Sequence, residues 1–158
     1  MRHSVRKGFS FGITSGIITT LGLIVGLHAG TGSQAVVIGG ILTIAVADAF
    51  SDALGVHVSE EAENVHRDRE IWAATVSTFV AKFAFAMTFA VPLLLLPLGA
   101  ALIASLVWGL SLLAIFSYYM ARQQGAQPWR VVGEHLLIAA VVIAITHYVG
   151  DWVGEAFG

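Results

Sequence analysis

The sequence of 158 residues is poor in charge and contains no cysteine. Charged residues make up 11% of the chain, which is less than half of the roughly 25% typical of soluble globular domains. So few charges exclude a disordered chain, a nucleic-acid-binding protein and an ordinary soluble enzyme. The absence of cysteine excludes a disulfide framework, a thiolate metal site and a cysteine nucleophile. Because 57% of the residues are hydrophobic, we expect the excess apolar surface to face a lipid bilayer.

Long apolar segments divide the chain into expected membrane-spanning helices. A bilayer core of about 30 Å needs about 20 apolar residues per helix. Turn residues separate the segments, with Gly30 to Ser33 after the first and Pro92, Pro97 and Gly99 between the third and fourth. We therefore expect an all-α polytopic protein with one domain over residues 1–158 and five spans, at residues 8–29, 35–57, 71–95, 98–121 and 131–151.

The basic residues predict the orientation of these helices. If the N-terminus is cytoplasmic, the cytoplasmic segments hold seven of the eight basic residues and the opposite side holds none. Such a distribution is typical of the positive-inside rule. We expect a cytoplasmic N-terminus, a C-terminus on the opposite side, and a location in the cell membrane of a prokaryote or an internal membrane otherwise. The seven residues are Arg2, Arg6, Lys7, Arg67, Arg69, Arg122 and Arg130.

Two aspartates inside the second span are the first candidates for chemistry. Asp48 and Asp52 are four residues apart, so they share one helix face, with Ser51 near it. Two such carboxylates repel each other unless a cation lies between them or one is protonated. Hard oxygen ligands of this kind suit a divalent ion such as Mn²⁺, Fe²⁺ or Mg²⁺. The alternative is a buried ion pair with Lys82, which lies in the third span and could be a partner or gate.

An acidic group follows at the cytoplasmic end of the second helix. His57 and Glu61 are spaced i,i+4, and Glu60 and Glu63 are spaced i,i+3, which are spacings for shared cation binding on a helix. His66 completes the group. We expect these residues either to capture metal or to form a solvated helix end whose acids are balanced by neighbouring arginines.

The fifth span carries a second series of ionisable residues. Glu134 lies near its start, while His147, Asp151 and Glu155 follow one another at i,i+4 steps toward the outer face. This series could relay protons or release a cation, or it could be a simple acidic cap.

Glycines recur at every fourth position of the first span. Such small-xxx-small faces allow helix backbones to approach closely. We therefore expect the first helix to pack at the centre of the subunit or at a dimer axis, through Gly8, Gly12, Gly16, Gly22 and Gly26.

Two segments resemble the vacuolar iron transporter family. TSGIITTLGLIVGL in the first span is similar to the family signature of a small residue, Asp and Gly before an apolar run that ends in Gly-Leu. ADAFSDALGVHVSEEAE resembles the end of the family's second helix. The resemblance implies a homodimeric exporter that moves Fe²⁺ or Mn²⁺ out of the cytosol in exchange for protons. It also implies an ion path between the two copies of the first helix.

Three features depart from the family pattern. Ser15 stands where the family has Asp, and Asp52 stands where it has Met. The short segment Ser59–Glu70 replaces the family's long cytoplasmic metal-binding helices. We expect Asp48 and Asp52 to supply the charge missing at Ser15, because the second helix would pack beside the first.

The leading hypothesis is therefore a divalent-cation transporter without enzymatic activity or a resident cofactor. Metal would be collected near the acidic group, pass to Asp52 and Asp48, and leave on the side of His147 and Asp151, with Thr19 supplying a hydroxyl oxygen. Expected partners are the lipid bilayer, divalent metal ions and a second copy bound through the first helix, and no nucleic acid. The alternative is a non-transporting membrane subunit for assembly or metal sensing. An intramembrane aspartyl protease is disfavoured, because it needs its two aspartates on separate helices.

Overall fold

The computed structural model describes residues 2–65 and 67–158, and these residues are almost entirely helical. No strand occurs in the described ranges, which agrees with the all-α prediction. Five helical units are long and apolar enough to cross a membrane, with α3 and α4 counted as one. The chain is therefore an integral, multi-pass membrane protein. Its helices are α1 (Arg2–Thr31), α2 (Gln34–Ala62), α3 (Asp68–Thr88), α4 (Ala90–Leu95), α5 (Leu98–Gln124) and α6 (Pro128–Phe157).

Short turns with the expected chemistry join the helices. Gly32 and Gly125 follow the ends of α1 and α5 with φ values of 57° and 69°, a left-handed conformation that favours glycine. The Ser33 side chain caps α2 by accepting a hydrogen bond from the Val36 N–H at 3.4 Å. Pro128 begins α6, where its missing N–H costs no helical hydrogen bond. These signals fix where each helix stops and the next begins.

The third span is interrupted at Phe89, a break that the prediction of one helix over residues 71–95 does not include. Pro92 has no N–H to donate to the carbonyl of Thr88, so the helix cannot continue unchanged through this point. Instead α3 ends at Thr88, Phe89 separates the two pieces, and α4 continues toward Leu95. The turn to the next span lies at Leu96 and Pro97. Pro92 and Gly99, which the sequence places in that turn, lie inside α4 and α5.

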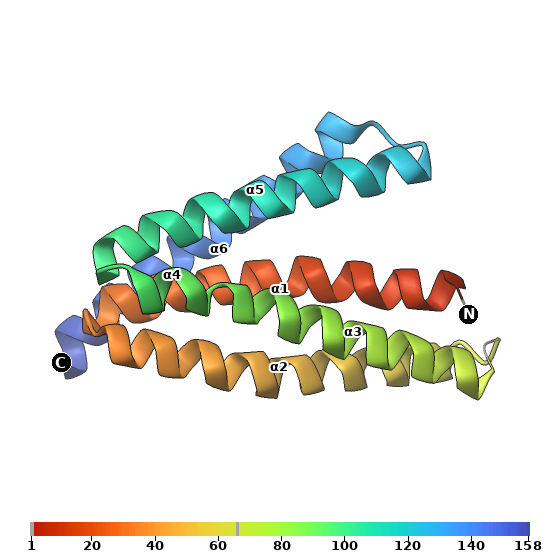
Figure 1. Ribbon diagram of the computed structural model, residues 1–158, viewed down its shortest axis with the longest axis horizontal. Coiled ribbons are helices and arrows are strands. Elements are labelled where there is room, and N and C mark those ends of the chain that lie inside the picture. The colour runs from red at the N-terminus through yellow and green to blue at the C-terminus, as the bar shows by residue number, and fades with distance from the viewer. Residues whose placement is uncertain (1, 66) are drawn as a thin grey trace.

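The first helix lies at the centre of the bundle. Figure 1 shows α1 between α2 and α3 on one side and α5 and α6 on the other. The N-terminus, the α2–α3 connection and the α5–α6 turn gather at one end, whereas the C-terminus lies at the other. We call the first of these the basic end, because Arg6, Lys7, Arg67, Arg69, Arg122 and Arg130 belong to its segments.

The glycines of α1 are used for packing within the chain. A Cβ atom on Gly12 would lie 2.6 Å from the backbone oxygen of Thr78 in α3, and one on Gly16 would lie 3.1 Å from that of Lys82. On the opposite face, a Cβ on Gly26 would lie 3.1 Å from the Thr146 oxygen of α6. A Cβ atom on Gly8 would likewise meet α3, and one on Gly22 would meet α6. The two glycine faces therefore bring α3 and α6 against α1 at the centre of the subunit.

Replacing Gly12 by leucine should separate α1 from α3. The new side chain has no space against the backbone near Thr78, and overpacking of this kind costs about 1–3 kcal/mol. We expect the melting temperature in detergent to fall by at least several degrees. The matched control is Gly133→Leu, because nothing lies within 4 Å of a Cβ built at Gly133. Equal melting temperatures of the two variants would contradict the packing described above.

Candidate cation site

A lysine bridges the two aspartates of the second span. The Lys82 Nζ lies 2.6 Å from the Asp48 Oδ2 and also pairs with the Asp52 Oδ2. Lys82 donates a hydrogen bond to the Ser15 Oγ at 2.8 Å. The Ser15 hydroxyl in turn donates to the Asp52 Oδ2 at 2.6 Å. Three helices thus bring four polar side chains together, and we call Ser15, Asp48, Asp52 and Lys82 the central cluster.

The central cluster lies at membrane depth and has an excess of negative charge. Asp48 lies near the middle of α2 and Lys82 near the middle of the span that begins at Asp68. Two carboxylates and one ammonium leave a formal charge of −1. Lys82 is only 2% exposed, whereas Asp48 and Asp52 are 26% and 20% exposed. Ionisable groups at this depth are costly and are usually functional, so the exposed sides of the two carboxylates can accept a further cation or proton.

Two hollows meet at this cluster along the surface between α1 and α2. One has a volume of about 650 Å³ and is lined by Leu23, Val36, Thr43 and Asp48, among others. The other has a volume of about 480 Å³ and extends from Lys7 and Phe11 to Asp52. Ser51 lines both hollows. The predicted residue Ser51 therefore marks the point where a path along the α1–α2 face passes the two carboxylates.

Thr19 contributes less to this cluster than the sequence suggests. Its hydroxyl donates a hydrogen bond to the Ser15 carbonyl at 2.8 Å, within α1. Thr19 lines neither of the two hollows. Ser15, in contrast, contacts both Lys82 and Asp52 directly.

A second lysine bridges two of the acids at the end of α2. Lys7 of α1 forms an ion pair with Glu60 and lies 3.3 Å from the Glu63 Oε1. Glu60 is only 1% exposed, although it lies near the helix end. Lys7 and Lys82 are the two lysines of the chain, and each bridges a pair of carboxylates on α2. This arrangement repeats the central cluster at the basic end of the same helix, and we call Glu60 and Glu63 the second acid pair.

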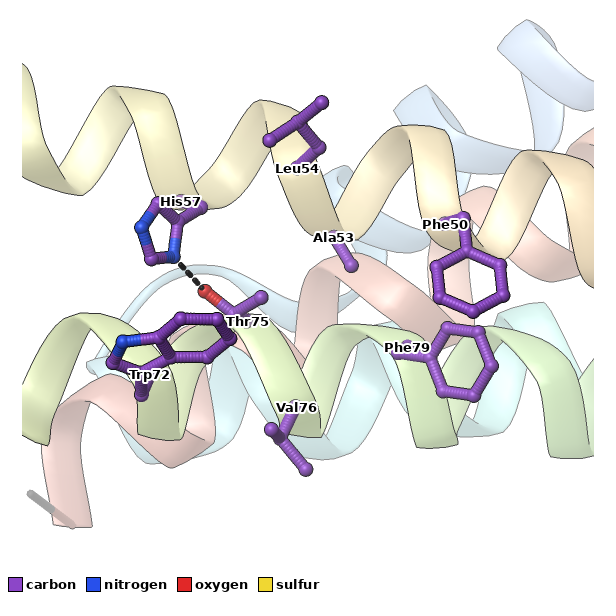
Figure 2. A pocket seen from close by; sticks show the side chains of 8 residues that line it. All are labelled: Phe50, Ala53, Leu54, His57, Trp72, Thr75, Val76 and Phe79. Atoms are coloured by element: carbon purple, nitrogen blue, oxygen red, sulfur yellow. Dashed lines mark hydrogen bonds between the residues drawn. The ribbon is translucent and has the colours of Figure 1, made fainter.

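His57 points away from these glutamates. Figure 2 shows it beside Trp72 at one end of an apolar pocket between α2 and α3, with Phe50 and Phe79 at the other end. The His57 and Trp72 ring centroids are 4.8 Å apart. The Thr75 hydroxyl donates to the Ile71 carbonyl at 2.8 Å. His57 Nδ1, 2.9 Å away, therefore donates its proton to Thr75.

The expected acidic group is therefore divided between two helix faces. His57 Nε2 faces Glu61 at 4.0 Å, whereas Glu60 and Glu63 face Lys7 on α1. In the described ranges, no three His, Asp or Glu side chains converge as a metal cage requires. His66 lies outside those ranges. The two pairs predicted by spacing both form, but they do not make one site.

The ionisable residues of the last helix lie apart from the central cluster. Glu134 accepts from Arg130 at 3.0 Å, and His147 lies 3.3 Å from Asp151. All four side chains are about half exposed or more. None of them lines either hollow of the α1–α2 face. A release route through His147 and Asp151 would have to begin beyond the end of that face.

Two features of the site are not part of the sequence prediction. Lys7 appears in the sequence only as one of the flanking basic residues, although it holds Glu60 and Glu63. The second feature is a stripe of small residues along α2, all exposed and spaced four apart, the same signal that marks α1. We call it the α2 stripe: Ala35, Gly39, Thr43, Ala47, Ser51, Gly55 and Ser59.

Comparison with known proteins agrees with the resemblance seen in the sequence. Residues 7–72 match the model described as the VIT family. The matched segment contains most of α1, all of α2 and the start of α3. It therefore includes Ser15, Asp48 and Asp52 of the central cluster, and Glu60 and Glu63. No curated protein matches the chain. The matched segment is therefore similar to the VIT family, and it lies in a chain whose five long apolar helices are those of a multi-pass membrane protein.

Proposed function

We propose that this protein transports divalent transition-metal cations, Fe²⁺ or Mn²⁺, out of the cytosol in exchange for protons. The observation that carries this proposal is the central cluster: two carboxylates with one ammonium between them, in the middle of two membrane-spanning helices and beside two hollows. A purely structural ion pair needs one carboxylate for one lysine. The second carboxylate supplies the charge that a transported cation would neutralise.

The ligand chemistry supports a small divalent cation. Carboxylate and hydroxyl oxygens are hard ligands that suit Mn²⁺ and Fe²⁺, and Ser15, Asp48 and Asp52 supply them. Lys82 occupies the space between the carboxylates, so a metal ion binds there only when the ammonium moves aside. A proton and a metal ion compete for the same carboxylate oxygens, which gives a physical basis for exchange of one against the other.

The α1–α2 face supports a path on both sides of the cluster. The hollow that begins at Lys7 leads from the basic end to Asp52, and the other leads from Asp48 toward Val36. Lys7, held by Glu60 and Glu63, lies at the start of this path. The second acid pair would then receive the cation first, in place of Lys7, and the central cluster would receive it next.

The same face supports a homodimer. Polar groups at membrane depth are costly when they face lipid, yet Asp48, Ser51 and Asp52 are partly exposed there. Nothing lies within 4 Å of a Cβ built at Gly39 or Gly55, and small residues at such spacing allow close helix approach. A second copy that covers the α2 stripe and the adjoining face of α1 would enclose the path between the subunits.

A cross-linking experiment tests this interface without interference from native thiols, because the chain has no cysteine. Across a two-fold axis at the α2 stripe, Gly55 would lie near its own copy. We expect Gly55→Cys to form a disulfide-linked dimer under mild oxidation in membranes. Ile103→Cys, on the exposed side of α5, is the control. The proposed interface is wrong if Ile103→Cys cross-links as readily as Gly55→Cys.

Transport is tested with purified protein in liposomes. A metal-sensitive dye inside the vesicles reports Mn²⁺ or Fe²⁺ uptake, and a pH-sensitive dye in a parallel sample reports proton movement. We expect metal uptake to be accompanied by a rise in internal pH, since protons leave as metal enters. Empty liposomes of the same composition are the control. Absence of uptake for both metals would overturn the proposal.

A second candidate is a metal-sensing or assembly subunit that does not transport. It is favoured by one observation, that a lysine already neutralises part of each acid pair on α2. A membrane protein that does not transport ions would need only this pairing of each lysine with the acids. Binding of Mn²⁺ to the purified protein, measured as a rise in melting temperature, together with absence of flux, would favour this candidate over the transporter.

A further inference from the structure

A basic pocket lies between α1 and α5 at the basic end of the bundle. It has a volume of about 290 Å³ and shares only Lys7 with the lining of the hollows on the α1–α2 face. Figure 1 shows α5 diverging from α1 toward this end. Three basic side chains of α1 and three side chains of other kinds line the pocket: His3, Arg6, Lys7, Ser10, Met120 and Gln124.

The positive charge around this pocket is only partly neutralised. Arg6 donates to the neutral amide oxygen of Gln123 at 3.1 Å. In the described part of the chain, no carboxylate pairs with Arg6 or with Arg122 in the last turn of α5. The pocket also lies at the first turns of α1, which has no acidic residue in its first turn. The positive end of the helix dipole adds to the charge of the side chains there.

The surroundings of the pocket have the character of a membrane interface. Tyr118 and Trp129 lie at the same end, with ring centroids 5.2 Å apart, and such aromatic residues are enriched at the level of lipid headgroups. On α1, Val5 and Phe9 are 42% and 44% exposed. Phe9 lies about one turn beyond Arg6 along α1, and its ring centroid is 6.5 Å from that of Phe116 in α5, so an apolar surface adjoins the basic side chains.

We propose that this pocket binds the headgroup of an anionic phospholipid. The phosphate accepts hydrogen bonds from Arg6, and the acyl chains lie along Phe9. Basic pockets between membrane-spanning helices commonly hold anionic headgroups, with about a fivefold gain in binding for each basic residue. The bound lipid would join α1 to α5 at the end where the two helices diverge. This site does not depend on the transport activity proposed above.

Native mass spectrometry of the detergent-purified protein tests the site, with phosphatidylglycerol and phosphatidylcholine of identical acyl chains as probes. We expect the wild type to bind phosphatidylglycerol more tightly than phosphatidylcholine. Arg6→Gln should weaken phosphatidylglycerol binding by about fivefold. Gln124→Glu, which adds a negative charge at an exposed lining position, should weaken it at least as much. Melting temperatures near that of the wild type will show that both variants fold.

The matched control is Arg130→Gln, which removes the same charge from the same end but outside the pocket. This variant should bind phosphatidylglycerol as the wild type does. Equal weakening by Arg130→Gln would mean that general surface charge attracts the lipid, and the proposal would be wrong. Equal binding of the two lipids would also overturn it. Complete displacement of phosphatidylglycerol by excess inorganic phosphate would show a simple anion site and exclude a lipid as its specific occupant.

Discussion

Asp52→Asn is expected to lower the rate of Mn²⁺ uptake into liposomes by at least about 100-fold. The substitution keeps the size of the side chain and its ability to accept from Ser15, but it removes one negative charge. The central cluster would then hold one carboxylate and one ammonium, with a formal charge of zero. A divalent cation entering this site would find no excess negative charge to neutralise, and its binding would be lost.

The control for this variant is Glu155→Gln. Glu155 is an exposed acid at the other end of the molecule, and surface charges of this kind contribute little. We expect uptake within about twofold of the wild-type rate. Comparable rates for Asp52→Asn and the wild type would contradict a role of the central cluster in transport.

Lys82→Met is expected to lower the melting temperature in detergent by about 10 °C. Removing one partner of a buried ion pair costs about 3–5 kcal/mol, because the remaining charge loses its neutralising partner. Here Asp48 and Asp52 would both remain, four residues apart on one helix and without the ammonium between them. Adding Mn²⁺ should restore much of the lost stability, since a cation can occupy the vacated space.

A double variant separates charge from packing in this experiment. In Lys82→Met with Asp52→Asn, the unbalanced carboxylates are reduced to one, so we expect the melting temperature to recover by about half. Mn²⁺ should have a weaker effect than on the single variant. If Lys82→Met melts at the wild-type temperature and does not respond to Mn²⁺, the ammonium is not the cation that balances the two aspartates.

Much of the fold follows from local features of the sequence. The length of the apolar segments predicts the five spans, and Gly32, Gly125 and Pro128 mark helix ends for stereochemical reasons. The position of the break at Phe89 could also have been derived, because Pro92 removes a hydrogen bond to a residue four positions earlier. The turn to the next span lies between the predicted bounds at residues 95 and 98, whereas Pro92 interrupts the third helix and takes no part in that turn.

The partners of each charge could not be derived in the same way. Spacing shows that Asp48 and Asp52 share a face of α2, but not which neighbouring helix that face meets. The neighbouring helix that each face meets depends on the rotation of the helices in the bundle. This rotation follows from tertiary contacts such as those of Gly12 and Gly16 with α3. For this reason spacing alone leaves open whether the two aspartates bind a divalent cation or form a buried ion pair with Lys82.

The polar residues at the end of α2 also have partners that spacing does not predict. His57 and Glu60 are three residues apart, yet His57 faces Thr75 on α3 and Glu60 faces Lys7 on α1. A helix that packs against two neighbours can direct adjacent polar residues to different helices. The α2 stripe, in contrast, is a local feature of the sequence, because its small residues recur every four positions like those of α1.

The most direct test of the central cluster is calorimetric titration of Mn²⁺ into the purified protein. The wild type should bind Mn²⁺, and a variant with both Asp48→Asn and Asp52→Asn should give no binding heat. A variant with both Asp151→Asn and Glu155→Gln, which removes two charges at the other end, should bind as the wild type does. If the Asp48 and Asp52 double variant binds Mn²⁺ as tightly as the wild type, the central cluster is not the cation site.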